Sequence, residues 1–130
     1  NYKITSISFG KTKNVGSSKI LMNLKKLLNN YFLRKTKKIN IDILISGSKK
    51  QNLIWNELKK ISYGKTKSYG EIAEIVKTSP RYVGKVCGQN KHLIIIPCHR
   101  VIRSDGKLGG FSGTGGIKLK QRLLNLEKSI

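Results

Sequence analysis

The chain has 130 residues and carries 27 lysines and arginines against 6 aspartates and glutamates, a formal net charge of +21. This length suits one compact unit or two small domains that share a core. So much positive charge on a folded surface repels itself, which favours a polyanionic partner. Nucleic acid is favoured over an anionic membrane, because no predicted helix pairs a basic face with exposed aromatic residues.

The sequence also argues against several other classes of protein. We expect no signal peptide, and no apolar run reaches the ~18 residues that a membrane span needs. Its two cysteines, Cys87 and Cys98, are fewer than a small secreted scaffold usually carries, so we expect reduced thiols in the cytoplasm. Because it lacks Cys-x-x-Cys, His-x-x-x-His and carboxylate clusters, we expect neither a metal nor a cofactor.

Strand and helix patterns alternate in the first third of the chain. Residues 2–9 are strand-like, and residues 39–45 place an isoleucine at every second position, which predicts a strand with one buried face. Between them, residues 18–33 predict an amphipathic helix. Its apolar stripe consists of Ile20, Leu21, Leu24, Leu27, Leu28, Tyr31 and Phe32. A Ser-Gly-Ser break follows, and we divide the chain there into domains of residues 1–46 and 47–130.

Three helix starts follow, each marked by a capping signal. The signals are the capping boxes Ser48-x-x-Gln51 and Ser68-x-x-Glu71, and the N-cap Ser79 before a first-turn Pro80. The first helix carries the apolar residues Ile54, Trp55, Leu58 and Ile61. Only three residues, 77–79, separate the second helix from the third, which we expect to end near Gln89. Two short helices at this spacing predict a helix-turn-helix.

The stretch Ile94–Ile102 combines a strand-like pattern with reactive side chains. Its β-branched residues predict a buried strand over Ile94–Ile96. Pro97 cannot continue a ladder, so the chain is expected to leave the sheet just before Cys98. An imidazole, His99, follows the cysteine, and a guanidinium follows the imidazole. A thiol with an imidazole and positive charge nearby meets the conditions for forming a nucleophilic thiolate.

The remaining residues predict a turn, a loop and a closing helix. Asp105-Gly106 indicates a turn, as between the two strands of a wing. A glycine-rich loop at residues 109–116 leads into a helix that carries Leu119, Leu123, Leu124 and Leu126. We therefore predict an α+β fold, in which a small N-terminal strand and helix domain precedes a winged helix-turn-helix domain.

The sequence of Ile94–Ile102 closely resembles the active-site motif of a known protein family. Five further segments match the same family in order and spacing. They are Trp55–Ala73, Arg81–Gly84, Asn90 eight residues before Cys98, Gly110–Gly113, and Leu123-Leu124 with Glu127. The family is the O6-alkylguanine-DNA alkyltransferases, which are suicide DNA-repair proteins. The chain departs from it at Tyr82, where a small residue is usual, and in lacking the zinc ligands of some relatives.

The resemblance implies a winged helix-turn-helix alkyltransferase domain that repairs DNA by one irreversible transfer. The alkyl group of O6-alkylguanine, and of O4-alkylthymine, in double-stranded DNA would move to Cys98. The nucleotide would first be flipped out of the duplex by a protein bound in the minor groove. The resemblance also implies a monomer that needs no cofactor and no metal.

Five residues receive catalytic roles from the resemblance. Cys98 would be the nucleophile, and His99 would take its proton through a water while Glu127 orients the imidazole ring. Asn90 would support this network. Tyr69 would donate a hydrogen bond to guanine N3 as negative charge develops on the departing base.

Two further groups of residues are implied to bind the substrate. The residues expected at the DNA are Ser68, Arg81, Tyr82 and Gly84, and Arg81 would occupy the vacated base stack. The residues expected to line the alkyl pocket are Pro97, Val101, Phe111 and Ser112. Of the remaining polar residues, we expect Cys87 to pack in the core, His92 to lie in a loop and Arg100 to pair with an unidentified carboxylate.

Two alternatives to alkyl transfer stay open. A non-enzymatic winged-helix protein that binds lesions or regulates genes would also carry a basic surface, although relatives that only bind lesions lack the reactive cysteine. A cysteine hydrolase would use Cys98 and His99, but such dyads normally draw their histidine from a distant segment.

Overall fold

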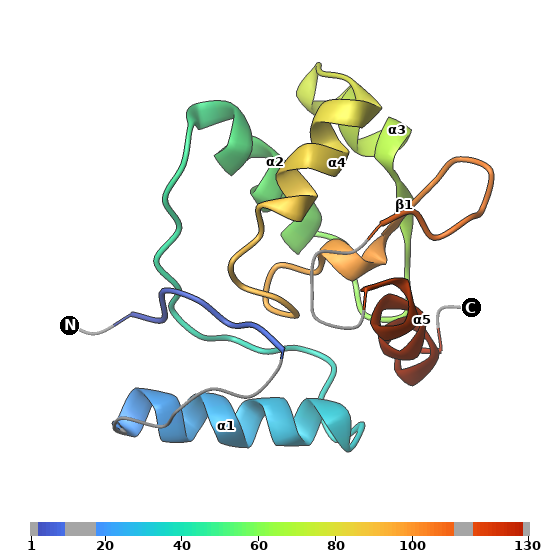
Figure 1. The fold of residues 1–130 in the computed structure, drawn as a ribbon. Coiled ribbons are helices and arrows are strands. Elements are labelled where there is room, and N and C mark those ends of the chain that lie inside the picture. Colours follow the sequence, from blue (N-terminus) through green and yellow to red (C-terminus); the bar gives the residue numbers. More distant parts are fainter. Residues whose placement is uncertain (1–2, 10–17, 111–115, 129–130) are drawn as a thin grey trace.

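A computed structural model describes residues 3–9, 18–110 and 116–128. The elements are α1 (Lys19–Phe32), α2 (Lys49–Lys59), β1 (Lys67–Ser68), α3 (Tyr69–Val76), α4 (Pro80–Gly88), the 3₁₀ helix η1 (Cys98–Arg100), β2 (Val101–Ile102) and α5 (Gly116–Leu126). Figure 1 shows their arrangement, and the α+β class is confirmed. Among the described residues no helix is long and apolar enough to cross a membrane. The predicted pocket residues Phe111 and Ser112 lie outside the described ranges.

The three helices with capping signals form where the sequence predicts them. Ser48 and Gln51 exchange side chain–backbone hydrogen bonds at the start of α2, and Ser68 and Glu71 do the same at α3. Ser79 accepts the hydrogen bond that caps α4. The helices α2, α3 and α4 pack around one core (Figure 1). Its fully buried members include Ile54, Leu58, Ile72, Val83, Val86 and Val101. The packing of α3 on α4 matches the predicted helix-turn-helix.

The predicted strand Ile94–Ile96 is wrong, because this segment forms a tight turn. Ile94 has a positive φ of 75°, and Leu93 pairs with Ile96 in an isolated bridge. The amide of Asn90 donates to the Ile96 carbonyl at 2.8 Å, and its oxygen accepts from the His92 backbone at 2.8 Å. Side-chain hydrogen bonds to the backbone thus replace those of a ladder. Ile94 and Ile96 are buried, so the apolar pattern here indicates burial without an extended backbone.

The two predicted N-terminal strands are also wrong, although the segments lie side by side. Ile4 forms an isolated bridge with Ile43, and three residues later Ile7 bridges His92 instead. Because residues 3–9 change partner, no ladder grows beyond one bridge in the described part of this segment. The isoleucines of residues 39–45 are half-buried and the residues between them are exposed, as the alternation predicts.

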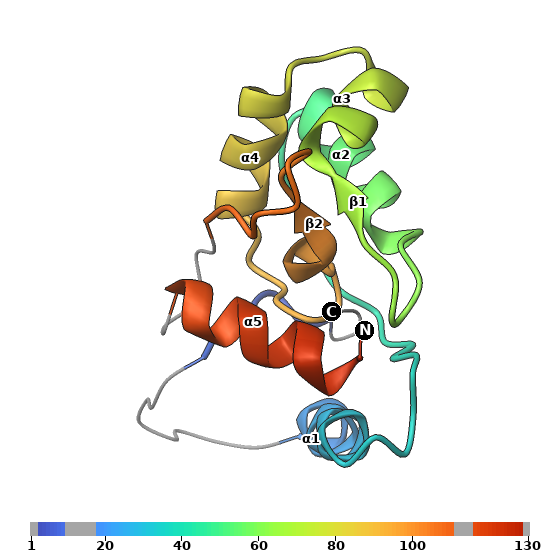
Figure 2. The same cartoon turned by 90° about the vertical axis from the view of Figure 1, so that its right-hand side faces the viewer.

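A two-residue parallel sheet connects the helix-turn-helix to the segment that carries Cys98. Lys67 of β1 pairs with Val101 of β2, and Ser68 pairs with Ile102 (Figure 2). The predicted turn at Asp105-Gly106 forms, but the described residues that flank it make no antiparallel strand pair. The predicted wing is therefore wrong in this respect, because the backbone hydrogen bonds across the turn in the described residues join only Arg103 with Gly106 and Lys107, and no ladder extends beyond them.

Helix α1 lies beyond α5, on the far side from the helix-turn-helix (Figure 2). Only Leu24 and Tyr31 of its predicted stripe are fully buried, whereas Leu21 and Phe32 are 48% and 42% exposed. Tyr31 forms a second apolar cluster with Ile94 and Leu123 of α5. The C-terminal end of α1 is thus its principal contact with this cluster.

Candidate active site

Cys98 lies at the start of η1 and is nearly inaccessible, with 3% of its surface exposed. The side-chain amide of Asn90 donates to its Sγ at 3.3 Å while also bonding to the Ile96 carbonyl. Burial raises the pKa of the Cys98 thiol, although the Asn90 hydrogen bond and the positive charge of Lys120 act against this rise. The resting thiol is therefore protonated and needs a base before it can act as a nucleophile.

The residue after Cys98, His99, forms a buried pair with a carboxylate. His99 Nε2 is 2.7 Å from Glu127 Oε2, and both side chains are fully buried. Burial lowers the pKa of His99, and the adjacent Glu127 only partly compensates. Because an ionised carboxylate can only accept, Nε2 carries the imidazole proton and Nδ1 keeps a lone pair. Nδ1 has no hydrogen-bond partner among the described residues, so it is available to accept a proton.

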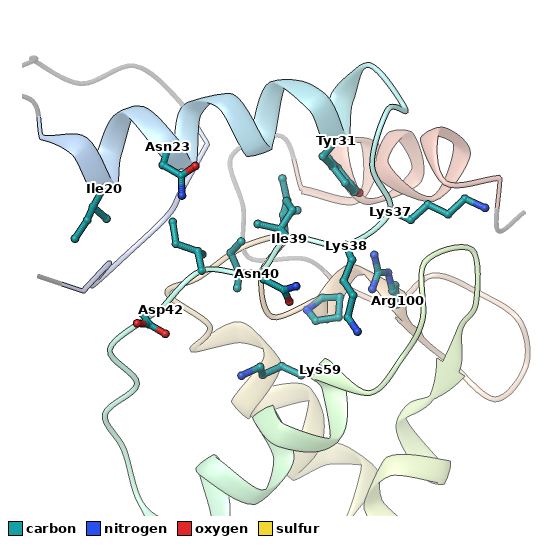
Figure 3. Close-up of a pocket in the computed structure, with 14 residues that line it drawn as sticks. Ile20, Asn23, Tyr31, Lys37, Lys38, Ile39, Asn40, Asp42, Lys59 and Arg100 are labelled. Carbon is teal, nitrogen blue, oxygen red and sulfur yellow. The ribbon is translucent and has the colours of Figure 1, made fainter.

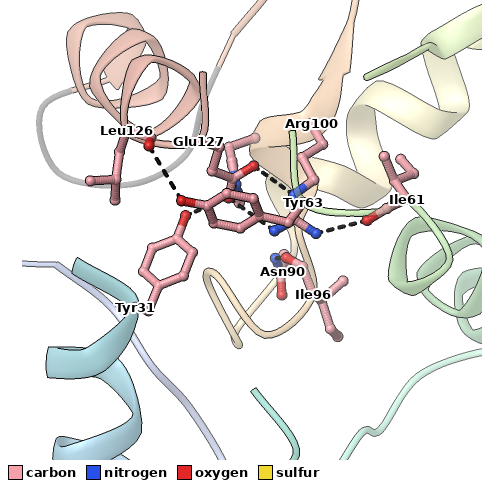
Figure 4. A network of polar contacts seen from close by, with 9 residues as sticks. Tyr31, Ile61, Tyr63, Asn90, Ile96, Arg100, Leu126 and Glu127 are labelled. Atoms are coloured by element: carbon pink, nitrogen blue, oxygen red, sulfur yellow. Dashed lines mark hydrogen bonds and ion pairs between the residues drawn. The ribbon is translucent and has the colours of Figure 1, made fainter. Parts of the chain in front are cut away.

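Glu127 accepts hydrogen bonds from three other side chains, those of His99, Arg100 and Tyr31 (Figure 4). Arg100 binds both of its oxygens, with Nε 2.8 Å from Oε1 and Nη2 2.9 Å from Oε2, and Nη1 donates to the Ile61 carbonyl at 2.7 Å. The hydroxyl of Tyr31 also donates to Oε2. Burial favours a raised pKa, but the hydrogen bonds from His99, Arg100 and Tyr31 hold the pKa of Glu127 at about 2. Glu127 is therefore the partner of Arg100 that the sequence did not identify.

Glu127 should make the folded protein sensitive to acid in a defined range. Its pKa is lowered from 4.5 to about 2, so its stabilising effect is complete above pH 4.5 and is lost as the pH falls through about 2. We expect the free energy of unfolding, measured with urea, to decrease by about 3 kcal/mol over this range. Glu57→Gln is the control variant, because the ion-pair partner of Glu57, Lys60, is 70% exposed, and it should show the same decrease as the unaltered protein. A stability that stays constant from pH 5 to 2 would contradict this electrostatic role.

Lys120 is a buried cation that the sequence analysis missed. Its side chain is inaccessible, and Nζ donates to the Val101 and Leu108 carbonyls at 2.6 Å each and to the Gly110 carbonyl at 3.3 Å. Nζ also lies 3.2 Å from the Tyr69 hydroxyl. Burial lowers the pKa of Lys120 to about 8. The hydrogen bonds of Lys120 thus hold residues 101–110 against α5.

Helical spacing contained a signal for this lysine. Lys120 precedes Leu123, Leu124 and Glu127 by three, four and seven residues. This helical spacing places the first three on one face of α5, and Glu127 follows on the same side one residue past its end, where its amide donates to the Leu123 carbonyl. The leucines predict that this face is buried. A lysine in the same register is therefore a candidate for a buried, fully paired cation.

A cavity of ≈1010 Å³ brings several predicted site residues together. Its lining includes Cys98, Tyr69, Arg81 and Gly84. Burial raises the pKa of Tyr69, so its hydroxyl keeps its proton. Cys87 lines the same cavity beside Cys98, although the sequence suggests only a packing role for it. The cavity therefore presents a thiol, a phenol and a guanidinium to one bound group.

Other predicted site residues lie elsewhere. The Ser68 hydroxyl caps α3, and Tyr82 packs partly against the core. Val101 is fully buried and offers its carbonyl to Lys120. Pro97 is buried and lines a different cavity, next to α1. His92 is also buried, with Nε2 3.1 Å from the Ile4 carbonyl, so it is more than a surface loop residue.

The chain is similar to a family model and to several known proteins. A family model described as the DNA-binding domain of 6-O-methylguanine DNA methyltransferase matches residues 49–129. A methylated-DNA–protein-cysteine methyltransferase from Sulfolobus acidocaldarius is 46% identical over 101 residues, which make up 76% of this chain and 62% of that relative. The chain thus spans less than two thirds of this relative's length.

Two solved structures show related folds. The crystal structure of Mycobacterium tuberculosis OGT in complex with DNA has a TM-score of 0.79 and 41% identity, and the match covers 84% of this chain and 68% of that one. S. pombe Atl1, in complex with damaged DNA containing O6-carboxymethylguanine, has a TM-score of 0.56 and 27% identity, with 64% and 79% covered. With the family model matching more than half of its residues, the chain belongs to the 6-O-methylguanine DNA methyltransferase family.

Proposed function

We propose that this protein repairs DNA by moving an alkyl group from O6 of an alkylguanine to Sγ of Cys98. The observation that carries the proposal is the buried Cys98 thiol, which lines a cavity together with Tyr69 and Arg81. In the reaction the carbon–O6 bond breaks and a carbon–sulfur bond forms. The thiol proton leaves to a base, and the departing guanine regains a proton. Because a thioether does not return to a thiolate, each molecule reacts once.

His99 is the proposed base. Its Nδ1 holds a lone pair, and the resemblance to known alkyltransferases suggests that the Cys98 proton reaches it through a water. Glu127 fixes the tautomer through Nε2 and stabilises the imidazolium that results. Asn90 donates to Sγ and thereby favours the thiolate over the thiol.

Tyr69 is the proposed donor to the leaving base. Lys120 Nζ lies 3.2 Å from the phenol oxygen and is itself a donor, so the oxygen accepts this bond. The phenol's own proton is then free to point into the cavity. A positioned donor at guanine N3 stabilises the charge that develops as the alkyl group leaves.

Duplex DNA is the proposed partner, with O4-alkylthymine as a second substrate. The net charge of +21 supplies phosphate contacts. A target atom inside the duplex must be exposed by flipping the nucleotide, at a cost of a few kcal/mol. Arg81 is exposed in the first turn of α4 and lines the cavity, which supports the proposal that it fills the vacated stack from the minor groove.

Arg81→Ala should slow repair of duplex DNA by on the order of 10-fold or more, because its side chain offsets part of the flipping cost. Reaction with free O6-benzylguanine needs no flipping and should keep its rate. Lys85→Ala is the matched control, since Lys85 is an exposed cation on the same helix. The two rates are measured by label transfer and mass spectrometry. Equal losses on both substrates would show that Arg81 does not fill the stack.

A second candidate function is lesion binding without chemistry, since the chain is also similar to Atl1, solved with damaged DNA. Incubation with duplex DNA that carries labelled O6-methylguanine distinguishes the two. Label on the protein supports alkyl transfer, and label that stays on tightly bound DNA supports lesion binding. DNA that is neither bound nor altered would exclude both, and would leave the hydrolase alternative to be tested.

A further inference from the structure

Tyr31 reaches the polar network of the site from α1, far from the other members in sequence. Its hydroxyl donates to Glu127, 96 residues away, and the side chain is only 1% exposed. Its ring meets the Tyr63 ring edge-on, with centroids 5.9 Å apart. Figure 4 shows the phenol extending from α1 towards the carboxylate.

The rest of α1 is less buried than Tyr31, and Leu24 is its only other buried residue. A cavity of ≈600 Å³ is lined by Ile20, Asn23 and Tyr31 from α1 and by Arg100 from η1 (Figure 3). Tyr31 is therefore the residue through which this helix reaches Glu127. The apolar contacts of Tyr31 with Ile94 and Leu123 would form equally well with phenylalanine at this position. They therefore do not account for the hydroxyl that donates to Glu127.

The hydroxyl shares one carboxylate oxygen with the proposed base. Oε2 of Glu127 accepts from Tyr31, from His99 Nε2 at 2.7 Å and from Arg100 Nη2 at 2.9 Å. Each donor draws negative charge from this oxygen. The charge that remains determines how strongly the carboxylate stabilises a proton on the imidazole.

We propose that Tyr31 is a positioning residue that tunes the proton affinity of His99 through Glu127, so that α1 takes part in the chemistry. The inference rests on the proposed function, in which His99 accepts the thiol proton. Without the Tyr31 hydroxyl, Oε2 carries more negative charge and holds the imidazolium more tightly. The pH at which His99 titrates then rises.

The other charged and titratable groups around the pair do not replace this contact. Arg100 and Lys120 face His99 and lower its pKa, and both remain when Tyr31 is changed. The Tyr63 hydroxyl donates to the Leu126 carbonyl at 3.3 Å, not to Glu127. Lys37 lies 6.0 Å from the Tyr63 ring centroid, and the Arg34 charge acts on Tyr63. Among the described residues, the other two donors to Glu127 Oε2, His99 and Arg100, both belong to η1. Tyr31 is the donor that comes from a different element, α1.

Histidine NMR tests this inference directly, because the sequence contains only two histidines. In Tyr31→Phe the titration midpoint of His99 should rise by on the order of 0.5 pH, a ~3-fold gain in proton affinity for the loss of one hydrogen bond. His92 serves as the internal reference. Tyr63→Phe, which removes a neighbouring hydroxyl without touching Glu127, should leave the His99 midpoint in place. The acid limb of the transfer rate should move together with the midpoint.

A second variant gives the opposite sign and keeps the shape of the side chain. Incorporation of 3-fluorotyrosine at position 31 makes the phenol a stronger donor and should lower the His99 midpoint. If Tyr31→Phe does not fold, the His99 midpoint of the 3-fluorotyrosine variant alone tests the role of Tyr31. Unchanged midpoints in the folded variants, or shifts in the reverse directions, would overturn the role of Tyr31. Because these titrations need no DNA, absence of transfer by the unaltered protein would overturn the proposed function separately.

Discussion

Replacing Cys98 with alanine should abolish alkyl transfer completely and leave the affinity for duplex DNA unchanged. The thiol is the only proposed nucleophile, whereas affinity arises from contacts between phosphates and basic side chains. Cys98 is neutral and buried, so its loss removes no such contact. Label transfer measures the reaction, and fluorescence anisotropy at several salt concentrations measures binding. The unaltered protein and the Cys98→Ala variant should both lose affinity for duplex DNA steeply as the salt concentration increases.

Cys87→Ala is the matched control for this result. Cys87 lines the same cavity as Cys98, but burial raises its pKa to about 12. A thiol that stays protonated is a poor nucleophile, so this variant should keep transfer. Label found on the Cys98→Ala protein would show that another group reacts, and it would contradict the mechanism.

Lys120→Met should slow transfer by roughly 100-fold, the scale seen when one positioned donor is lost. The variant keeps the apolar length of the side chain but leaves the Val101 and Leu108 carbonyls and the Tyr69 oxygen without this donor. Unpaired buried carbonyls should also lower the free energy of unfolding by about 2 kcal/mol, since relief from burying an ammonium offsets part of their cost. Transfer rates and urea unfolding measure the two effects.

Lys118→Met provides the control, because Lys118 is an exposed lysine on the same helix. It should change neither the stability nor the chemical step. Lys120→Met should slow the reactions of duplex DNA and of free O6-benzylguanine alike, in contrast to Arg81→Ala. A loss confined to duplex DNA would assign Lys120 to DNA binding and would contradict its proposed effect on Tyr69.

Local signals predicted the helical part of the fold well. Ser48, Ser68 and Ser79 each cap a helix because capping depends on residues within one turn of chain, which a sequence displays directly. The strands were predicted poorly for the complementary reason. A ladder needs a partner segment along its whole length, and residues 3–9 divide their pairing between Ile43 and His92. Apolar alternation reports burial, and only a partner turns burial into a strand.

The candidate site shows the same division between local and distant information. Cys98, His99 and Asn90 lie within nine residues of one another, and their roles were proposed from the residue types and their spacing. The contacts of Glu127 with Arg100 and Tyr31 join distant segments, so the sequence left Arg100 without a partner and placed Tyr31 in an apolar stripe. These residues were recognisable only when the fold placed them around one carboxylate.

Mass spectrometry of the protein after reaction with excess duplex DNA containing O6-methylguanine tests the central claim most directly. We expect the protein to gain the mass of one methyl group and no more, with the whole gain on the peptide that contains Cys98. Demethylated guanine should appear in equal amount and then stop increasing. Continued turnover, or a methyl group on any peptide other than that of Cys98, would contradict irreversible transfer to this thiol.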